Sequence, residues 1–172
     1  MDLTRLRTGE KIAGIAGIAL IVIMFAFDWF SANFAGVSGV VTANAWGSYG
    51  FTDLVLFVTA LAAIGLAYLT ATRQSVSLPV AASAIITALG ILSVILILIS
   101  IISPPDLGFT GPAVDHTRKA GVWLGLIAAG VLTYGGYLAM QEEGTSFGGE
   151  SDRFRSPGEG TPPPPPPPAS GP

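Results

Sequence analysis

Four long and strongly apolar stretches of the chain contain no charged residue. They cover residues 12–27, 54–72, 74–105 and 120–141. A helix that crosses a hydrocarbon core about 30 Å thick needs about 20 mostly apolar residues. The pattern therefore predicts a membrane domain at residues 12–140 with four transmembrane helices, near residues 12–30, 53–71, 79–102 and 121–140.

Particular residues set the ends of two of these helices. Trp29 and Phe30 extend the first stretch to the length of a full crossing. Pro79 falls in the first turn of the third helix, where its missing N–H group costs nothing. Pro104 and Pro105 then end that helix, because proline cannot continue one.

The apolar stretches favour helices over strands. Residues 91–99 are apolar on every side of a helix, whereas a helix of a soluble bundle has a polar face. A strand in lipid requires a closed barrel and alternating polarity, which this run lacks. The predicted fold class is an all-α membrane protein, a four-transmembrane-helix bundle with a disordered proline-rich C-terminal tail.

Composition supports the membrane assignment and excludes several chemistries. Charged residues make up 11% of the chain, against about 25% in soluble proteins. Hydrophobic residues make up 51%, and the mean hydropathy is +0.65. The net charge of −3 gives no reason to expect a nucleic-acid partner. The chain has no cysteine, so disulfides, thiolate-bound metals and a cysteine nucleophile are excluded.

The C-terminal tail, residues 141–172, differs in composition from the membrane domain. It is rich in Gly, Ser, Glu and Pro and contains a run of prolines at 162–168. Such a segment buries too little apolar surface to offset chain entropy, so we expect it to be disordered. The proline run should form polyproline II, and it serves either as a spacer, which we favour, or as a ligand for an SH3- or WW-type groove.

The N-terminus admits two interpretations. Residues 1–11 are basic and precede an apolar core, and the small residues Ala43-Asn44-Ala45 follow, as in a signal peptide. That cleavage site lies far beyond the apolar core, and Trp29-Phe30 is typical of an interfacial anchor. We therefore expect residues 1–11 to remain as a cytoplasmic N-terminus.

Basic residues predict the orientation in the membrane. The N-terminus, the turn at 72–78 and the tail hold six Lys and Arg residues, whereas Arg118 and Lys119 are the two in the loops on the other side. By the positive-inside rule, both termini of a multi-pass protein of the plasma membrane should face the cytoplasm. Aromatic residues near the predicted outer interface should act as anchors: Trp29, Trp46, Tyr49 and Trp123.

The two predicted outer loops differ from each other. Residues 31–52 contain no charged residue and are too apolar for a solvated linker, so we expect a short helix or hairpin that lies on the bundle. Residues 103–120 contain three prolines, two aspartates and the one histidine of the chain, His116.

Ionisable residues offer little material for catalysis. No predicted span has one at its centre, where such a residue usually marks function. Asp28 and Asp53 lie at the outer ends of spans, and we expect Arg118 or Lys119 to pair with one of them across the outer rim. His116 lacks a ligand spacing for a metal, so a functional role for it is the weaker hypothesis. The sequence predicts no catalytic, cofactor or metal site, and no enzyme.

Small residues recur at helical spacing in two predicted helices. They are Gly14 and Gly17 in the first, and Gly121, Gly125 and Ala129 in the fourth. Small faces let helices approach closely, and van der Waals contact then drives their association in lipid. Packing within the bundle is favoured over homodimerisation.

Several short motifs together resemble those of a group of uncharacterised small bacterial four-helix integral membrane proteins. The motifs are Arg7-Thr8-Gly9-Glu10, Phe27-Asp28-Trp29-Phe30, Trp46, Pro104-Pro105, and Gly-Val-Trp-Leu-Gly at 121–125. The resemblance covers residues 5–140. It includes the N-terminal Arg-x-Gly-Glu element and a tryptophan followed by an aromatic residue at the end of the first helix. Asp28 departs from it, since that group has proline or an apolar residue there. The resemblance implies the topology and transfers no active site.

Two hypotheses for function follow. The first is a non-enzymatic integral membrane protein that scaffolds or associates with other membrane proteins or with its own copies. The alternative is a small oligomeric transporter or channel component, for which the hydroxyl groups of the third helix would line a polar path. Ser83 and Thr87 share a helical face with Gly90, whereas Ser93 and Ser100 are expected to drift around it.

Overall fold

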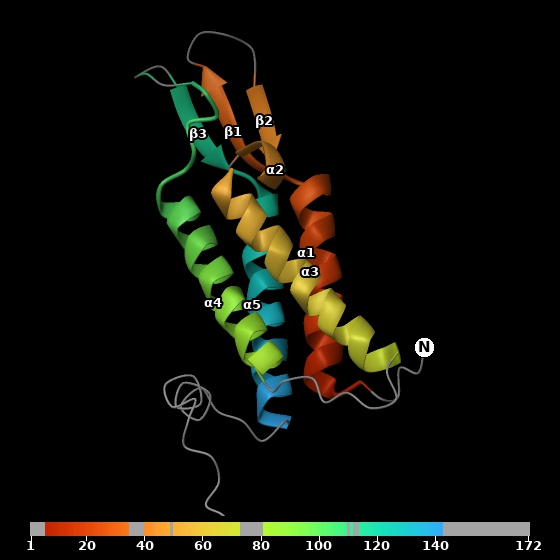
Figure 1. The fold of residues 1–172 in the computed structure, drawn as a ribbon. Helices are drawn as coiled ribbons and strands as arrows, with labels where there is room; N and C mark the ends of the chain where they lie inside the picture. Colours follow the sequence, from red (N-terminus) through yellow and green to blue (C-terminus); the bar gives the residue numbers. More distant parts are fainter. Residues whose placement is uncertain are drawn as a thin grey trace, which may run out of the picture.

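Four long helices lie side by side, and a small sheet extends from one end of them (Figure 1). The computed structural model describes residues 6–34, 40–48, 50–72, 81–109, 111 and 114–142. The helices are α1 (Thr8–Ala26), α3 (Phe51–Thr72), α4 (Ala81–Ile102) and α5 (Ala120–Glu142), with a short α2 (Ala45–Ser48). The strands are β1 (Asp28–Phe34), β2 (Val40–Asn44) and β3 (Val114–Arg118).

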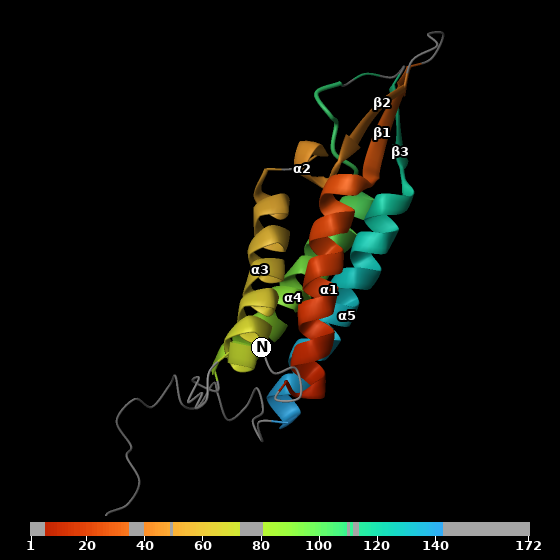
Figure 2. The same cartoon turned by 90° about the vertical axis from the view of Figure 1, so that its right-hand side faces the viewer.

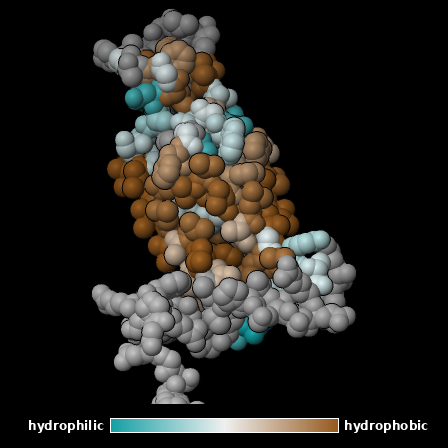
Figure 3. All heavy atoms as spheres, in the orientation of Figure 1, coloured by the Kyte–Doolittle hydropathy of each residue, from teal (hydrophilic) through white to brown (hydrophobic). Residues whose placement is uncertain are grey.

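The four long helices are each long and apolar enough to cross a membrane. Hydrophobic residues form a band around them, which gives way to paler and more hydrophilic residues where the sheet begins (Figure 3). The prediction of a multi-pass membrane protein is confirmed at this level. The predicted bounds of the last three helices differ from the observed ones by about two residues.

The first helix and the fold class need correction. We expected a helix at 12–30, but α1 begins at Thr8 and ends at Ala26, and Trp29 and Phe30 belong to β1. The length rule counted these two aromatic residues as part of the span. Their backbone groups instead pair with strands that lie further along the chain, so the protein is mostly helical and not all-α.

The sheet is antiparallel with the strand order β2-β1-β3. Ser31 of the central strand stands opposite Thr42 on one side and Thr117 on the other. Strands β1 and β2 pair as a hairpin, as residues 31–52 were expected to allow, but the hairpin begins at Asp28 and extends from the end of the bundle (Figure 1). Strand β3 was not predicted; it comes from the loop at 103–120 and lies beside β1, directly before α5 (Figure 2).

Glycine residues let the helix backbones approach one another. A Cβ atom built on Gly135 of α5 would lie 2.5 Å from the backbone nitrogen of Ala13 in α1. A Cβ atom on Gly90 of α4 would lie 2.5 Å from the hydroxyl of Thr133, and one on Gly136 would lie 2.8 Å from that of Thr87. Helix α5 therefore packs against both α1 and α4 through positions that admit no side chain.

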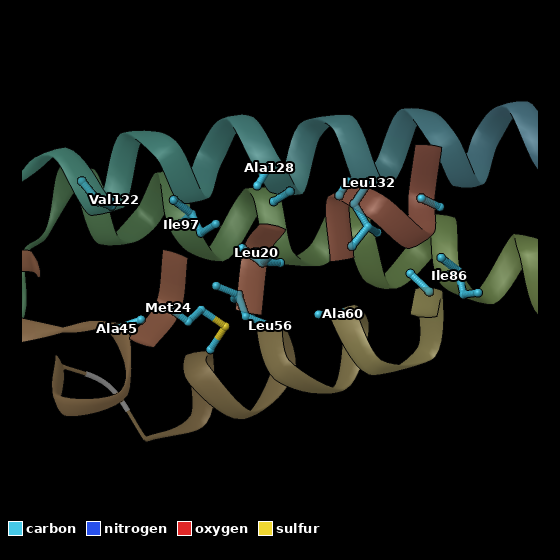
Figure 4. Packing of buried hydrophobic residues seen from close by; sticks show 14 of the residues in the cluster. Leu20, Met24, Ala45, Leu56, Ala60, Ile86, Ile97, Val122, Ala128 and Leu132 are labelled. Carbon is cyan, nitrogen blue, oxygen red and sulfur yellow. The ribbon is translucent and has the colours of Figure 1, made fainter. Parts of the chain in front are cut away.

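Larger side chains fill the centre of the bundle and cover its outside. Leu20, Met24, Leu56, Ile97 and Leu132 are fully buried between the helices (Figure 4). Many of the exposed large side chains are Ile, Leu or Val on the outer helix faces, where lipid would surround them. Close packing of small residues inside and bulky residues outside is typical of helices that associate in lipid.

Glu10 ties the N-terminal end of α1 to its neighbours. Its carboxylate is buried, with 4% of the residue exposed, and accepts hydrogen bonds from the Arg7 backbone N–H (3.1 Å) and the Thr70 hydroxyl of α3 (3.0 Å). The carboxylate of Glu142 at the end of α5 accepts one from the Gly9 backbone N–H (3.3 Å). The Arg-x-Gly-Glu element thus joins α1 to both α3 and α5.

Replacement of Gly135 by leucine should destabilise the bundle by about 3 kcal/mol, because its side chain would meet the backbone of α1. The free energy of unfolding can be measured by denaturant titration in micelles. Gly130→Leu is the matched control, since Gly130 lies on the same helix with nothing within 4 Å of a built Cβ. Equal losses in the two variants would contradict the close approach of α1 and α5.

Candidate functional site: the sheet and its joint to the helices

Trp29 joins the sheet to the bundle. The residue is fully buried, and its indole lies over two glycines in the first turns of α5. A Cβ atom on Gly121 would lie 2.5 Å from Trp29 Cδ1, and one on Gly125 would lie 2.5 Å from Trp29 Cη2. The backbone oxygen of Trp29 accepts a hydrogen bond from the Lys119 N–H (2.8 Å). One residue therefore fixes the base of β1 against the start of α5.

Each strand caps the C-terminal end of a helix with one polar side chain. The Trp29 indole N–H of β1 donates to the Ile23 carbonyl (3.2 Å), and Asn44 of β2 donates to the Phe25 carbonyl (3.3 Å), both in α1. Arg118 of β3 donates to the carbonyls of Ile101 (2.8 Å) and Ile102 (3.4 Å) in α4.

The last carbonyls of a helix have no partner within the helix, and they cannot be left unpaired near lipid. Strands β2 and β3 supply partners for the carbonyls of Phe25, Ile101 and Ile102, and the Trp29 indole adds a second donor to the Ile23 carbonyl, which also accepts from the Phe27 N–H (3.4 Å). Arg118 also places a positive charge at the negative end of the α4 dipole, which stabilises that end further. The sheet is thus a structural part of the bundle.

Alternate residues along the strands give the sheet two different faces. Phe30, Ala32 and Phe34 of β1 share a face with His116 of β3, and Phe34 stacks edge-on against Phe109 of the preceding loop (5.0 Å between ring centroids). The other face carries Asn33 with Thr42, Asp115 and Thr117, and the Asn33 amide donates to the Thr117 hydroxyl (3.2 Å). Thr42, Asp115 and Thr117 on the two outer strands of this face are exposed, whereas Ser31 between them on β1 is fully buried.

Two polar atoms are buried within the sheet region. Ser31 Oγ and His116 Nδ1 have no hydrogen-bond partner in the part of the chain that the structure describes. Within the same residues, no three His, Cys, Asp or Glu side chains lie close enough to hold a metal ion.

The four aromatic residues predicted as interfacial anchors have different environments. Trp29 is a core residue and not an anchor, because its indole is enclosed between α1 and α5. Trp46 and Trp123 are about half exposed, at 46% and 50%. Trp46 stacks on Phe25 of α1 (5.5 Å between centroids) and meets Phe57 of α3 edge-on (5.4 Å). Tyr49 lies outside the described residues.

The four residues considered for ion pairs lie around the base of the sheet. Asp28 is exposed at the start of β1, and Asp53 is buried in the first turn of α3, where a negative charge complements the helix dipole. Arg118 caps α4, and Lys119 is half-buried beside Trp29. An ion pair between these carboxylates and cations stays a prediction.

The predicted small residues lie at contacts within the chain. A Cβ atom on Gly14 would lie 2.9 Å from the Ala67 side chain, and one on Gly17 would lie 2.9 Å from the Ala60 carbonyl, both in α3. Ala129 is buried. Gly121 and Gly125 receive the Trp29 indole from a strand, which the Gly-x-x-x-Gly spacing alone did not indicate. Sequence reasoning named Gly90 only as part of the face of Ser83 and Thr87, and it missed Gly135 and Gly136 as contacts of α5.

Comparison with known protein families and with curated proteins finds no match to this chain. Its function is therefore inferred from the arrangement of its own residues.

The contact between Trp29 and Gly125 can be tested with a double-mutant cycle. Trp29→Ala should cost about 3–5 kcal/mol of stability, because it leaves a large cavity. Gly125→Leu should also destabilise, because leucine clashes with the indole. In the double variant the leucine occupies the vacated space, so the combined loss should be smaller than the sum by about 1–3 kcal/mol. Strictly additive losses in the free energy of unfolding would show that the two residues do not touch.

Proposed function

We propose that the protein is a non-enzymatic integral membrane protein that associates with other membrane proteins or with its own copies through its sheet. The observation that carries the proposal is the exposed polar face of Thr42, Asp115 and Thr117. That face is held in place by Trp29 and by the strand caps. A small platform fixed to the end of a membrane bundle is suited to binding, since its groups are already ordered.

The interior of the bundle supports a role without transport. The hydroxyls of Ser83, Thr87, Ser93 and Ser100 are at most 3% exposed, and they all face into the bundle. Thr87 and Gly90 of α4 meet α5, whereas Ser93 meets Thr59 of α3, so Ser93 lies on another side of α4 as expected, and burial extends to both sides. Thr87, Ser93 and Ser100 each donate to a carbonyl of their own helix, and Ser93 also bonds to Thr59 of α3 (3.1 Å).

This arrangement weakens the alternative of a transporter or channel component. A polar path requires hydroxyl groups that meet water or solute, either within one chain or between copies. The α4 hydroxyls serve instead as contacts between helices of one chain, where interhelical and back-bonded hydroxyls are common. A pore between copies of the chain would have to be lined by polar groups other than the α4 hydroxyls.

We further propose that the membrane is the plasma membrane, that both termini face the cytoplasm, and that the sheet lies outside. The distribution of Lys and Arg supports this orientation. The tail at 143–172 lies beyond the described residues, and its composition supports a second, cytoplasmic contact with partners.

The orientation can be tested with single cysteines, since the natural chain has none. Thr117→Cys on the sheet should react with a membrane-impermeant maleimide in intact cells. Thr72→Cys at the opposite end of the bundle should react only after the cells are permeabilised. The reverse labelling pattern would overturn the orientation.

Association can be tested by photo-crosslinking in native membranes. A photoreactive residue at Thr117 should yield defined protein adducts, whereas one at Ile95, on the outer face of α4, should yield mainly lipid adducts. Removal of residues 143–172 should eliminate part of the partner set. If Thr117 yields no protein adducts and the truncated chain keeps every partner, the proposed function is wrong.

A further inference from the structure

Two apolar grooves run along the lipid-facing side of α1. One lies between α1 and α3, with a volume of about 390 Å³ and walls formed mainly by Ile15, Ile18, Ile64 and Ala67. The other lies between α1 and α5, with a volume of about 410 Å³ and only apolar side chains in its lining. Both volumes fall within the range of about 300–1,000 Å³ that is common for ligand sites.

The two grooves differ at the end of the bundle where α1 begins. The α1–α3 groove also includes Lys11 and Tyr68 in its lining. Both side chains are exposed, and Lys11 has no ion pair among the residues that the structure describes. Glu10, the neighbouring carboxylate, is buried and already bonded to Thr70 and the Arg7 backbone. An unpaired ammonium group therefore stands beside an apolar channel.

We propose that the α1–α3 groove binds one anionic glycerophospholipid. An acyl chain would lie against the isoleucines and Ala67, and the phosphate would meet the Lys11 ammonium group. The combination matches the ligand because apolar walls accept a chain, and a cation near the membrane surface attracts anionic headgroups.

A second copy of this chain fits the groove less well. Closed association of two copies about a two-fold axis would place the same face of each against the other. The two Lys11 ammonium groups would then approach each other at the rim, and like charges so placed are unfavourable. A lipid phosphate brings the opposite charge and needs no second cation to be neutralised.

Native mass spectrometry of the full-length protein in detergent can measure the binding of the first lipid. Phosphatidylglycerol should bind about fivefold more tightly than phosphatidylcholine, as expected for one basic residue near the headgroup. Lys11→Gln should remove this preference, and Lys11→Arg should retain it. Lys119→Gln, a cation at the opposite end of the bundle, is the matched control and should leave the preference unchanged.

The groove itself is tested by filling it. Ile18→Trp places a large side chain in the α1–α3 groove at an exposed position, and should weaken the binding of both lipids. Ile127→Trp does the same in the α1–α5 groove and should have no effect on the first lipid. Circular dichroism verifies that both tryptophan variants fold. The Lys11 variants change only an exposed side chain, so they should fold like the natural chain.

Three results would overturn the proposal. The first is equal binding of the two lipids to the natural chain, and the second is an unchanged preference in Lys11→Gln. The third is a loss of dimer mass, rather than of bound lipid, in Ile18→Trp, which would assign the groove to a second copy.

Discussion

The contact of the Trp29 indole with Gly121 and Gly125 holds the two parts of the structure together. The indole occupies the space that two side chains would otherwise fill, and its N–H satisfies a carbonyl at the end of α1. Without this contact, β1 would leave the membrane bundle as an ordinary loop. With it, the central strand starts at a fixed position, and β2 and β3 can pair with it on either side.

Glycines also form the closest contacts between the helices. Glycine at the contacts of α5 with α1 and α4 brings backbones together, while hydroxyl groups at the interfaces bond to their own helix or to a neighbour. The buried hydroxyl groups of Thr59, Thr87, Ser93 and Ser100 are therefore all hydrogen-bonded. Groups available for binding lie at the ends of the bundle: the polar face of the sheet at one end, and Lys11 beside its groove at the other.

The helices could be predicted from the sequence because hydropathy and span length are local properties. The end of the first helix was misplaced because the span was extended to about 20 residues, although the uncharged stretch ends at Phe27, next to the observed end at Ala26. Strand β3 escaped prediction because Val114–Arg118 is short and polar, and only its pairing with β1 makes it a strand. The small residues at Gly121 and Gly125 indicated a packing site, but their spacing does not distinguish a helix from an indole as the partner.

The central claim is that the sheet is fixed to the bundle. Distances between spin labels at Thr117→Cys on β3 and Ile127→Cys on α5, in a chain without other cysteines, measure this directly in nanodiscs. A single narrow distance distribution is the predicted result. A broad or bimodal distribution would show that the sheet moves relative to the helices, and would contradict the fixed joint at Trp29.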